Sequence, residues 1–243
     1  MNSNPQDGTL VKKYGLALHT STPELGLAIS NFSGDYRCQT WNLGRNLATD
    51  LHQHLVEFIA PQTWADLAFI AVAKGPGGFT GTRMGMVTAR TLAQQLNIPV
   101  FTISTLAAVA WLEPQSRAGT GAPPLQSGGL LELEPPLQSE GFLRQDIALQ
   151  MPAQRGQLFG AVYSVNSNWG VTELFSDAVM TAESWQEKLD NWGSSYQLIE
   201  VGSELGASVS GVLDLAYLEW KQGSRPDWWD ALPYYGQHPV QGQ

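Results

Sequence analysis

The sequence predicts a mixed α/β fold, because short apolar runs first follow one another directly and then alternate with longer segments of helical spacing. Three apolar runs within residues 14–41 are separated only by turn residues, which favours an antiparallel meander. From residue 46 onward, helix-like and strand-like segments alternate, and this order is typical of a sheet with a parallel part. We therefore expect a sheet that combines antiparallel and parallel strands.

The elements of the first half are predicted from apolar spacing and from the residues that end each segment. Pro61 stops the first helix, and Asn97 with Pro99 ends the second. Ser104 is suited to cap a short third helix. Strands are expected at 14–18, 24–30, 36–41, 67–73 and 100–103, and helices at 46–60, 82–96 and 104–111.

Residues 114–141 interrupt this pattern and are rich in Pro, Gly, Ser and Gln. The segment Pro123–Ser127 returns, imperfectly duplicated, as Pro135–Ser139. Such a composition predicts a flexible insertion between an N-terminal lobe, 1–113, and a C-terminal lobe, 142–243. A proline-rich docking motif is the alternative, although no basic residue stands beside either proline pair.

The second half resumes with apolar runs that indicate a second α/β lobe. Strands are expected at 146–149, 158–165, 171–175 and 197–201, and helices at 181–192 and 211–222. The last helix is a candidate to pack back on the first lobe. The aromatic residues of the tail, Trp228, Trp229, Tyr234 and Tyr235, are expected to pack onto the body of the protein.

The composition excludes several classes of protein. Apolar residues make up 43% of the chain and charged residues only 14%, which suits a large core and a face covered by another protein. The net charge of −9 argues against unaided nucleic-acid binding. Cys38 stands alone, which suits a reducing compartment. The polar start resembles no secretory signal, and no long apolar run predicts a membrane span, so we expect a cytoplasmic protein.

The sharpest motif is the glycine-rich turn of residues 75–81, which lies between a predicted buried strand and a predicted helix. Backbone N–H groups in such a turn can contact phosphate, with Gly75, Gly77, Gly78 and Thr80 as the candidates. The spacing matches neither a P-loop nor a dinucleotide fingerprint. A tight turn that requires glycine for its backbone shape is the alternative, and both interpretations stay open.

The helix after this turn carries small residues at every fourth position: Gly81, Gly85, Ala89 and Ala93. Small side chains let another backbone approach closely, either from the protein's own sheet or from a partner. If the stripe faces a partner, Ala89→Glu is expected to abolish association and leave the protein folded.

No residues with the spacing of a catalytic or metal site are found. His52 and His54 are two apart on a predicted helix, whereas helical zinc pairs need a spacing of three or four. No nucleophile elbow occurs. His19, after the first strand, is followed by three hydroxyl residues that would cap a turn or contact an anion. We assign no catalytic residue and no metal ligand.

Two stretches resemble the TsaB family. Residues 16–22, Leu-Ala-Leu-His-Thr-Ser-Thr, are similar to the opening of TsaB proteins, in which Ile-Asp-Thr-Ser-Thr is usual. Residues 75–85, Gly-Pro-Gly-Gly-Phe-Thr-Gly-Thr-Arg-Met-Gly, closely resemble the family signature Gly-Pro-Gly-Ser-Phe-Thr-Gly-Val-Arg-Ile-Gly. The resemblance covers residues 14–112 well and the second half thinly.

The resemblance implies an actin/hexokinase-like (ribonuclease H-like) α/β architecture with two lobes and mixed sheets. It also implies a non-catalytic subunit that supports the catalytic TsaD subunit in threonylcarbamoyl transfer to a tRNA adenosine next to the anticodon. Further implied partners are a TsaE-like ATPase and a second copy of the chain, with tRNA reached only through the complex. No cofactor is implied, apart from ATP or ADP at the boundary of the complex.

In the family the partner contact is attributed to the first two helices of the first lobe. Carried onto this sequence, the interface candidates are Leu51, His54, Leu55, Phe58, Gly81, Arg83, Gly85, Ala89 and Ala93.

Two departures from the family pattern argue against an intact nucleotide site. His19 replaces the family's aspartate, and neutral imidazole is a poor magnesium ligand. Residues 152–155, Pro-Ala-Gln-Arg, stand where the family has Asp-Ala-Arg. The alternative function, a small-molecule kinase or ATPase of this fold, therefore lacks its acids. The older assignment of such chains as glycoproteases lacks metal ligands at usable spacing.

Overall fold

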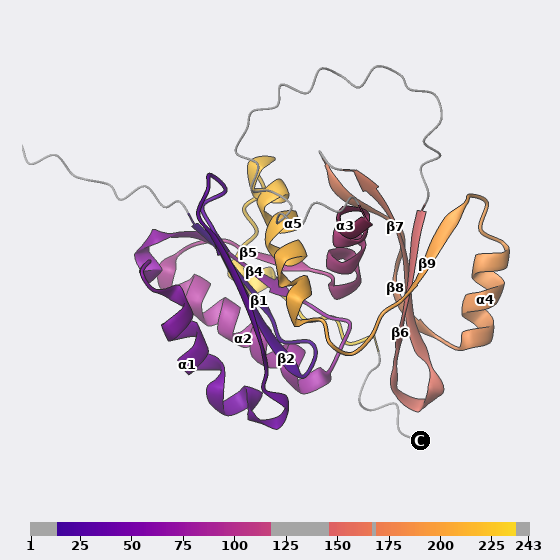
Figure 1. The fold of residues 1–243 in the computed structure, drawn as a ribbon, viewed down its shortest axis with the longest axis horizontal. Helices are drawn as coiled ribbons and strands as arrows, with labels where there is room; N and C mark the ends of the chain where they lie inside the picture. Colours follow the sequence, from indigo (N-terminus) through magenta and orange to yellow (C-terminus); the bar gives the residue numbers. More distant parts are fainter. Residues whose placement is uncertain (1–13, 118–145, 167–168, 237–243) are drawn as a thin grey trace, which may run out of the picture.

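The computed structural model describes residues 14–117, 146–166 and 169–236, which form two α/β lobes (Figure 1). The first lobe contains β1 (Tyr14–His19), β2 (Glu24–Ser30), β3 (Tyr36–Asn42), α1 (Leu47–Ile59), β4 (Leu67–Ala73), α2 (Phe79–Leu96), β5 (Val100–Ile103) and α3 (Thr105–Arg117). The second part contains β6 (Asp146–Pro152), β7 (Leu158–Asn166), β8 (Gly170–Met180), α4 (Ala182–Asp190), β9 (Tyr196–Glu200) and α5 (Val209–Lys221).

The first sheet has the strand order β3-β2-β1-β4-β5 and is mixed, as the sequence predicts. β1, β2 and β3 are antiparallel, with Ala17 opposite Ala28 in the first pair. β4 and β5 join in parallel to β1. Parallel strands need long connections, and α2 and α3 follow β4 and β5 at the edge where β1 also ends.

The second sheet has the order β8-β7-β6-β9 and repeats part of this plan. β6, β7 and β8 are antiparallel, and β9 runs parallel to β6. β8 is longer than the predicted 171–175 because it pairs with β7 from Gly170 to Met180. The apolar spacing is lost after Phe175, where a register shift in β7 interrupts the ladder.

The layers are helix, sheet, helix, sheet and helix (Figure 1). α1 and α2 cover the outer face of the first sheet around one apolar core, which contains Leu51, Ile70 and Ala89. α3 and α5 fill the space between the sheets, where the largest core joins Phe101 to Tyr163. α4 covers the outer face of the second sheet and buries its own Trp185 there.

Further predicted boundaries differ from the structure, most clearly those of α2 and α3; β6 also runs on from the predicted 149 to Pro152. α2 begins at Phe79 rather than Thr82, because Gly78 in extended conformation lets the helix start directly after the turn. α3 runs to Arg117 rather than ending at 111, so that Pro114 lies inside the helix. Residues 114–117 are therefore helical, and the remainder of the predicted insertion, 118–141, lies outside the described residues.

The tail prediction is confirmed for three of its aromatic residues. The ring of Tyr235 lies 4.6 Å from that of Phe79 on α2. Trp228 packs against the core under α1 and α2, and Tyr234 packs against the core between the sheets. Trp229 differs, because 55% of it is exposed.

Candidate functional site

The glycine turn lies where three parallel strands end side by side. The N–H of Lys74, just after β4, donates to the carbonyl of Ile103 at 2.8 Å, and the N–H of Thr105 donates to Gly75 at 2.8 Å. The N–H of Gly78 donates to Ser21, just after β1, at 2.7 Å. In open α/β sheets this edge is where ligands commonly bind. The turn is thus the first candidate for a ligand-binding site.

The glycines of the turn are required by close approach of other backbone segments. A Cβ on Gly77 would lie 2.2 Å from the carbonyl oxygen of Ser21. A Cβ on Gly75, which has a φ of 98°, would lie 2.5 Å from the carbonyl oxygen of Tyr234. Close packing therefore explains why glycine is required at these two positions.

The four phosphate candidates are not equally accessible. Gly75 is buried, and the N–H of Gly78 is already used by Ser21. Gly77 is half-buried against Ser21, while Thr80 is exposed in the first turn of α2. A phosphate contact stays a prediction, centred on the N-terminus of α2 rather than on the whole turn.

His19 ends β1 on the side that faces the second lobe, since it shares a strand face with Ala17 of the core between the sheets. It is fully buried, and neither ring nitrogen has a hydrogen-bond partner. Burial lowers the pKa of His19 to about 4, so the ring is neutral near pH 7. A neutral, enclosed imidazole cannot replace the carboxylate that a magnesium nucleotide site needs.

The space between the lobes beside the turn is filled by a hydrogen-bonded network. The hydroxyl of Tyr163 on β7 lies 3.3 Å from Oγ of Ser104 and donates to Oδ1 of Asp177 at 2.8 Å. Ser104 also accepts from the N–H groups of Leu106 and Ala107, which confirms it as the cap of α3. Burial raises the pKa of Asp177, although hydrogen bonding to Ser104 and Tyr163 opposes the shift.

The small-residue stripe of α2 faces the protein's own sheet, which corrects the interpretation of these residues as a partner surface. Gly85, Ala89 and Ala93 are buried, and Ala89 is 0% exposed. A Cβ on Gly85 would lie 2.1 Å from Oγ1 of Thr20. A Cβ on Gly81 would lie 2.1 Å from the carbonyl oxygen of Thr20. Thr20 also donates to the carbonyl of Gly81 at 2.8 Å. The stripe exists to let α2 approach the end of β1.

The interface candidates of α1 are likewise mostly internal. Leu51, Leu55 and Phe58 belong to the core under the helices and cannot meet a partner directly. His54 is half-buried, and its ring lies 4.6 Å from that of Trp41. Of the nine candidates, only Arg83 is exposed. The apolar stripe of α1 is therefore covered by the protein's own sheet.

The outward faces of the same two helices carry apolar residues that the sequence analysis missed. Val56 of α1 is 62% exposed, and Val87 of α2 is 54% exposed. Val87 stands four residues after Arg83, so both lie on one face of α2. Val56 falls outside the buried spacing of Leu51, Leu55 and Phe58. That displacement from the buried stripe is the sequence signal that could have identified it.

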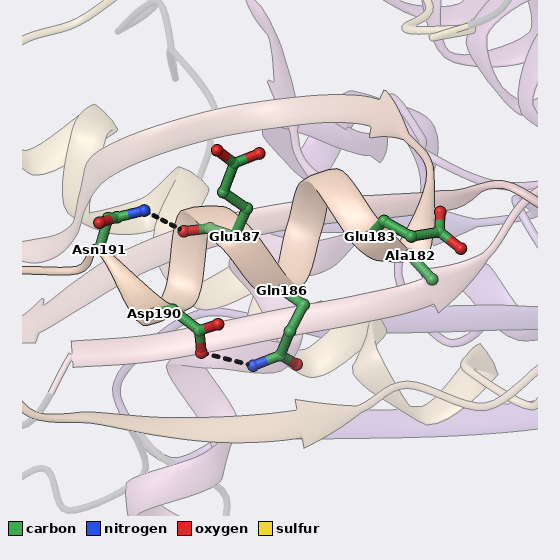
Figure 2. Close-up of a pocket in the computed structure, with 6 residues that line it drawn as sticks. All are labelled: Ala182, Glu183, Gln186, Glu187, Asp190 and Asn191. Atoms are coloured by element: carbon green, nitrogen blue, oxygen red, sulfur yellow. Dashed lines mark hydrogen bonds between the residues drawn. The ribbon is translucent and has the colours of Figure 1, made fainter.

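A shallow hollow lies on α4, away from the glycine turn, and is a weaker candidate for a functional site. Figure 2 shows its six lining residues, all on or beside α4. Gln186 donates to Asp190, and Asn191 donates to the carbonyl of Glu187, so these polar groups are satisfied within the helix face. The hollow is one exposed side of a helix.

Within the ranges that the structure covers, no group of three or more His, Cys, Asp or Glu side chains is arranged to hold a metal. No helix in those ranges is long and apolar enough to cross a membrane.

The fold and its glycine turn define an actin/hexokinase-like α/β protein. Two solved structures from Pseudomonas aeruginosa share it. One is described as YeaZ (TM-score 0.68, 20% identity, 91% of this chain and 100% of that chain). The other is described as an uncharacterized protein with similarity to peptidase YEAZ (TM-score 0.66, 20% identity, 93% and 100%).

Sequence comparisons find similarity to TsaB proteins. A model described as "TsaD: tRNA N6-adenosine threonylcarbamoyltransferase" matches residues 53–125. TsaB of Bacillus subtilis is 50% identical over 21% of this chain and 21% of its own length. TsaB of Buchnera aphidicola (Acyrthosiphon pisum) is 25% identical over 62% and 58%. The chain thus spans less than two thirds of these relatives. The predicted resemblance to TsaB is confirmed.

Proposed function

We propose that this chain is a non-catalytic subunit of the machinery that forms threonylcarbamoyladenosine in tRNA, and that it binds and supports a TsaD-like catalytic subunit. The TsaB resemblance supports this pathway. The observation that carries the non-catalytic role is His19, a fully buried imidazole with a pKa lowered to about 4 at the position of the expected carboxylate.

The proposed contact surface is the outward face of α1 and α2, which includes Val56, Arg83 and Val87. Val56 and Val87 keep more than half of their surface exposed on a chain in which most apolar residues of these helices are buried. Apolar exposure of this kind is typical of a protein contact when several such residues gather. The same face would serve a second copy of the chain.

The remaining partners follow from the same role. A TsaE-like ATPase would join through the complex, and tRNA would be bound by the assembly, because a net charge of −9 disfavours direct tRNA binding. The site for ATP or ADP in this proposal is the subunit boundary. The cytoplasm, where tRNA is modified, is the corresponding location.

A small-molecule kinase or ATPase is the second candidate, favoured only by the position of the turn at the ends of β1, β4 and β5. The inter-lobe space beside the turn is occupied by Tyr163 and Asp177, which bond to each other at 2.8 Å. A magnesium nucleotide would have to displace this pair and would find a neutral His19 instead of an acid.

The test is co-purification of the chain with the TsaD-like protein of the same genome, followed by light scattering on the mixture and on each protein alone. A stable mixed species is expected, and Val56→Glu combined with Val87→Glu should dissociate it. Leu174→Glu is the matched control, since Leu174 is 44% exposed on β8 of the other lobe.

The outcomes separate the two candidates. A mixed species that survives the double substitution would contradict the proposed surface. Separate species, together with ATP binding by this chain in calorimetry, would support the kinase or ATPase instead.

A further inference from the structure

Residues 231–236, here named the C-terminal strap, connect the two lobes beside the glycine turn. Ala231, at the start of the strap, is 2% exposed and belongs to the core under α1 and α2. Tyr234 packs against the other core, between the two sheets. The strap therefore leaves one apolar core and reaches a second within a few residues.

On the first lobe the strap lies directly on the glycine turn. The N–H of Tyr234 donates to the carbonyl of Lys74 at 2.6 Å. The carbonyl oxygen of Tyr234 occupies the space that a side chain on Gly75 would need. The ring of Tyr235 lies 4.6 Å from that of Phe79, the first residue of α2. Backbone and side chains of the strap thus cover the Gly75 end of the turn, while Gly78 and Thr80 stay exposed.

On the second lobe the strap is held by the other end of the same tyrosine. The hydroxyl of Tyr234 donates to the backbone carbonyl of Asp177 on β8 at 2.5 Å. Gly236, with a φ of 63°, lies so close to β7 and β8 that a Cβ would be 2.6 Å from Phe159 and 2.7 Å from Val179. Tyr234 therefore bonds to one lobe through its N–H and to the other through its hydroxyl.

Unpaired hydroxyl groups lie beneath the strap. Thr82 and Thr105 are buried, and their side-chain oxygens have no hydrogen-bond partner. Both adjoin Gly75: Thr105 donates its N–H to the Gly75 carbonyl, and the methyl of Thr82 lies 3.5 Å from the Gly75 Cβ position. A buried hydroxyl without a hydrogen-bond partner costs free energy. Exposure of these two hydroxyls to water or to a polar group would remove that cost.

We propose that the C-terminal strap is a latch: it holds the two lobes in their closed arrangement and covers the Gly75 end of the glycine turn. Opening the lobes at this edge separates Lys74 from Asp177, so Tyr234 has to release at least one of its two bonds. Release of the strap also exposes the Gly75 end of the turn and the hydroxyls of Thr82 and Thr105 together. This motion belongs to the chain itself and does not depend on its proposed partners.

The latch is tested by the distance between spin labels on the two lobes. Cys38, the single cysteine, is exposed on β3, and Ser194→Cys provides a second exposed position between α4 and β9. Tyr234→Phe removes the hydroxyl bond to Asp177 and keeps the ring. Gly236→Ala forces the strap away from Phe159 and Val179.

Gly223→Ala is the matched control, because Gly223 also has a positive φ, 91°, but no atom within 4 Å of its Cβ position. We expect Tyr234→Phe and Gly236→Ala to move the distance distribution to longer and broader values, and the control to leave it unchanged. The amide hydrogens of Lys74, Gly75, Gly77 and Gly78 should exchange faster in the same two variants. An unchanged distance distribution in both folded variants would overturn the proposal.

Discussion

The carboxylate of Asp214 accepts a hydrogen bond from the indole N–H of Trp111 at 3.1 Å, which joins α5 to α3 in the layer between the sheets. Asp214 is 3% exposed, and burial raises its pKa to about 7, with the Trp111 bond opposing the shift. His19 is buried on the facing side of the first sheet with its pKa lowered to about 4. The two groups therefore titrate abnormally over the same pH range with opposite effects on stability.

The first prediction concerns Asp214→Asn. Because the folded-state pKa is above the ordinary value of 3.8, the aspartate favours folding below pH 4 and progressively disfavours it as the pH rises to 7. The full effect is at most about 4 kcal/mol. The free energy of unfolding of Asp214→Asn, relative to the wild type, should therefore increase between pH 4 and 7 in urea titrations.

Asp230→Asn, at an exposed position, is the control and should show no such change. A difference between Asp214→Asn and wild type that is constant with pH would mean that Asp214 is ionised normally.

The second prediction concerns His19→Leu and has the opposite sign. The folded-state pKa is below the ordinary value of 6.5, so histidine supports folding above that pH and destabilises the protein as the pH falls towards 4. The size is at most about 3 kcal/mol. His19→Leu should gain stability relative to wild type as the medium is acidified from pH 7 to 4. A loss on acidification would refute a buried neutral imidazole.

The third prediction tests the contact between α2 and β1. Gly85→Ala places a methyl group 2.1 Å from Oγ1 of Thr20, and the strain should destabilise the protein by about 1–3 kcal/mol despite the better helix propensity of alanine. Thr20→Ala removes that oxygen, so the double variant should recover part of the loss. A double-mutant cycle in urea measures the coupling, and simple additivity would contradict the close contact.

The fourth prediction separates the two faces of α2. Ala89 is 0% exposed, so Ala89→Glu buries an unpaired charge and should unfold the protein in circular dichroism rather than abolish association alone. Val87→Glu, two positions away and more than half exposed, should leave the fold intact. If Ala89→Glu yields a folded protein of wild-type stability, the small-residue stripe does not pack on the sheet.

Periodicity was sufficient to place most elements, because spacing alone marks a segment as strand or helix. The strand at Leu67–Ala73 agrees at both ends with its apolar run. Periodicity failed where pairing, rather than composition, sets the length: β8 continues to Met180 because β7 lies beside it. The position of the glycine turn could be predicted from the sequence. The contact of Tyr234 with the turn could not be predicted, because Tyr234 and Lys74 are far apart in the chain.

The sequence by itself determined the mixed α/β class, the glycine turn between β4 and α2 and the lack of an acid at His19, since each depends on local residue types. Only the tertiary structure decided which faces remain open. Small residues such as Gly85 and Ala89 indicate that another segment packs closely against the helix. The protein's own sheet and a partner protein would both require the same small residues. Burial of Ala89 and exposure of Val87 settle that choice because a face covered by the chain's own core is unavailable to another protein.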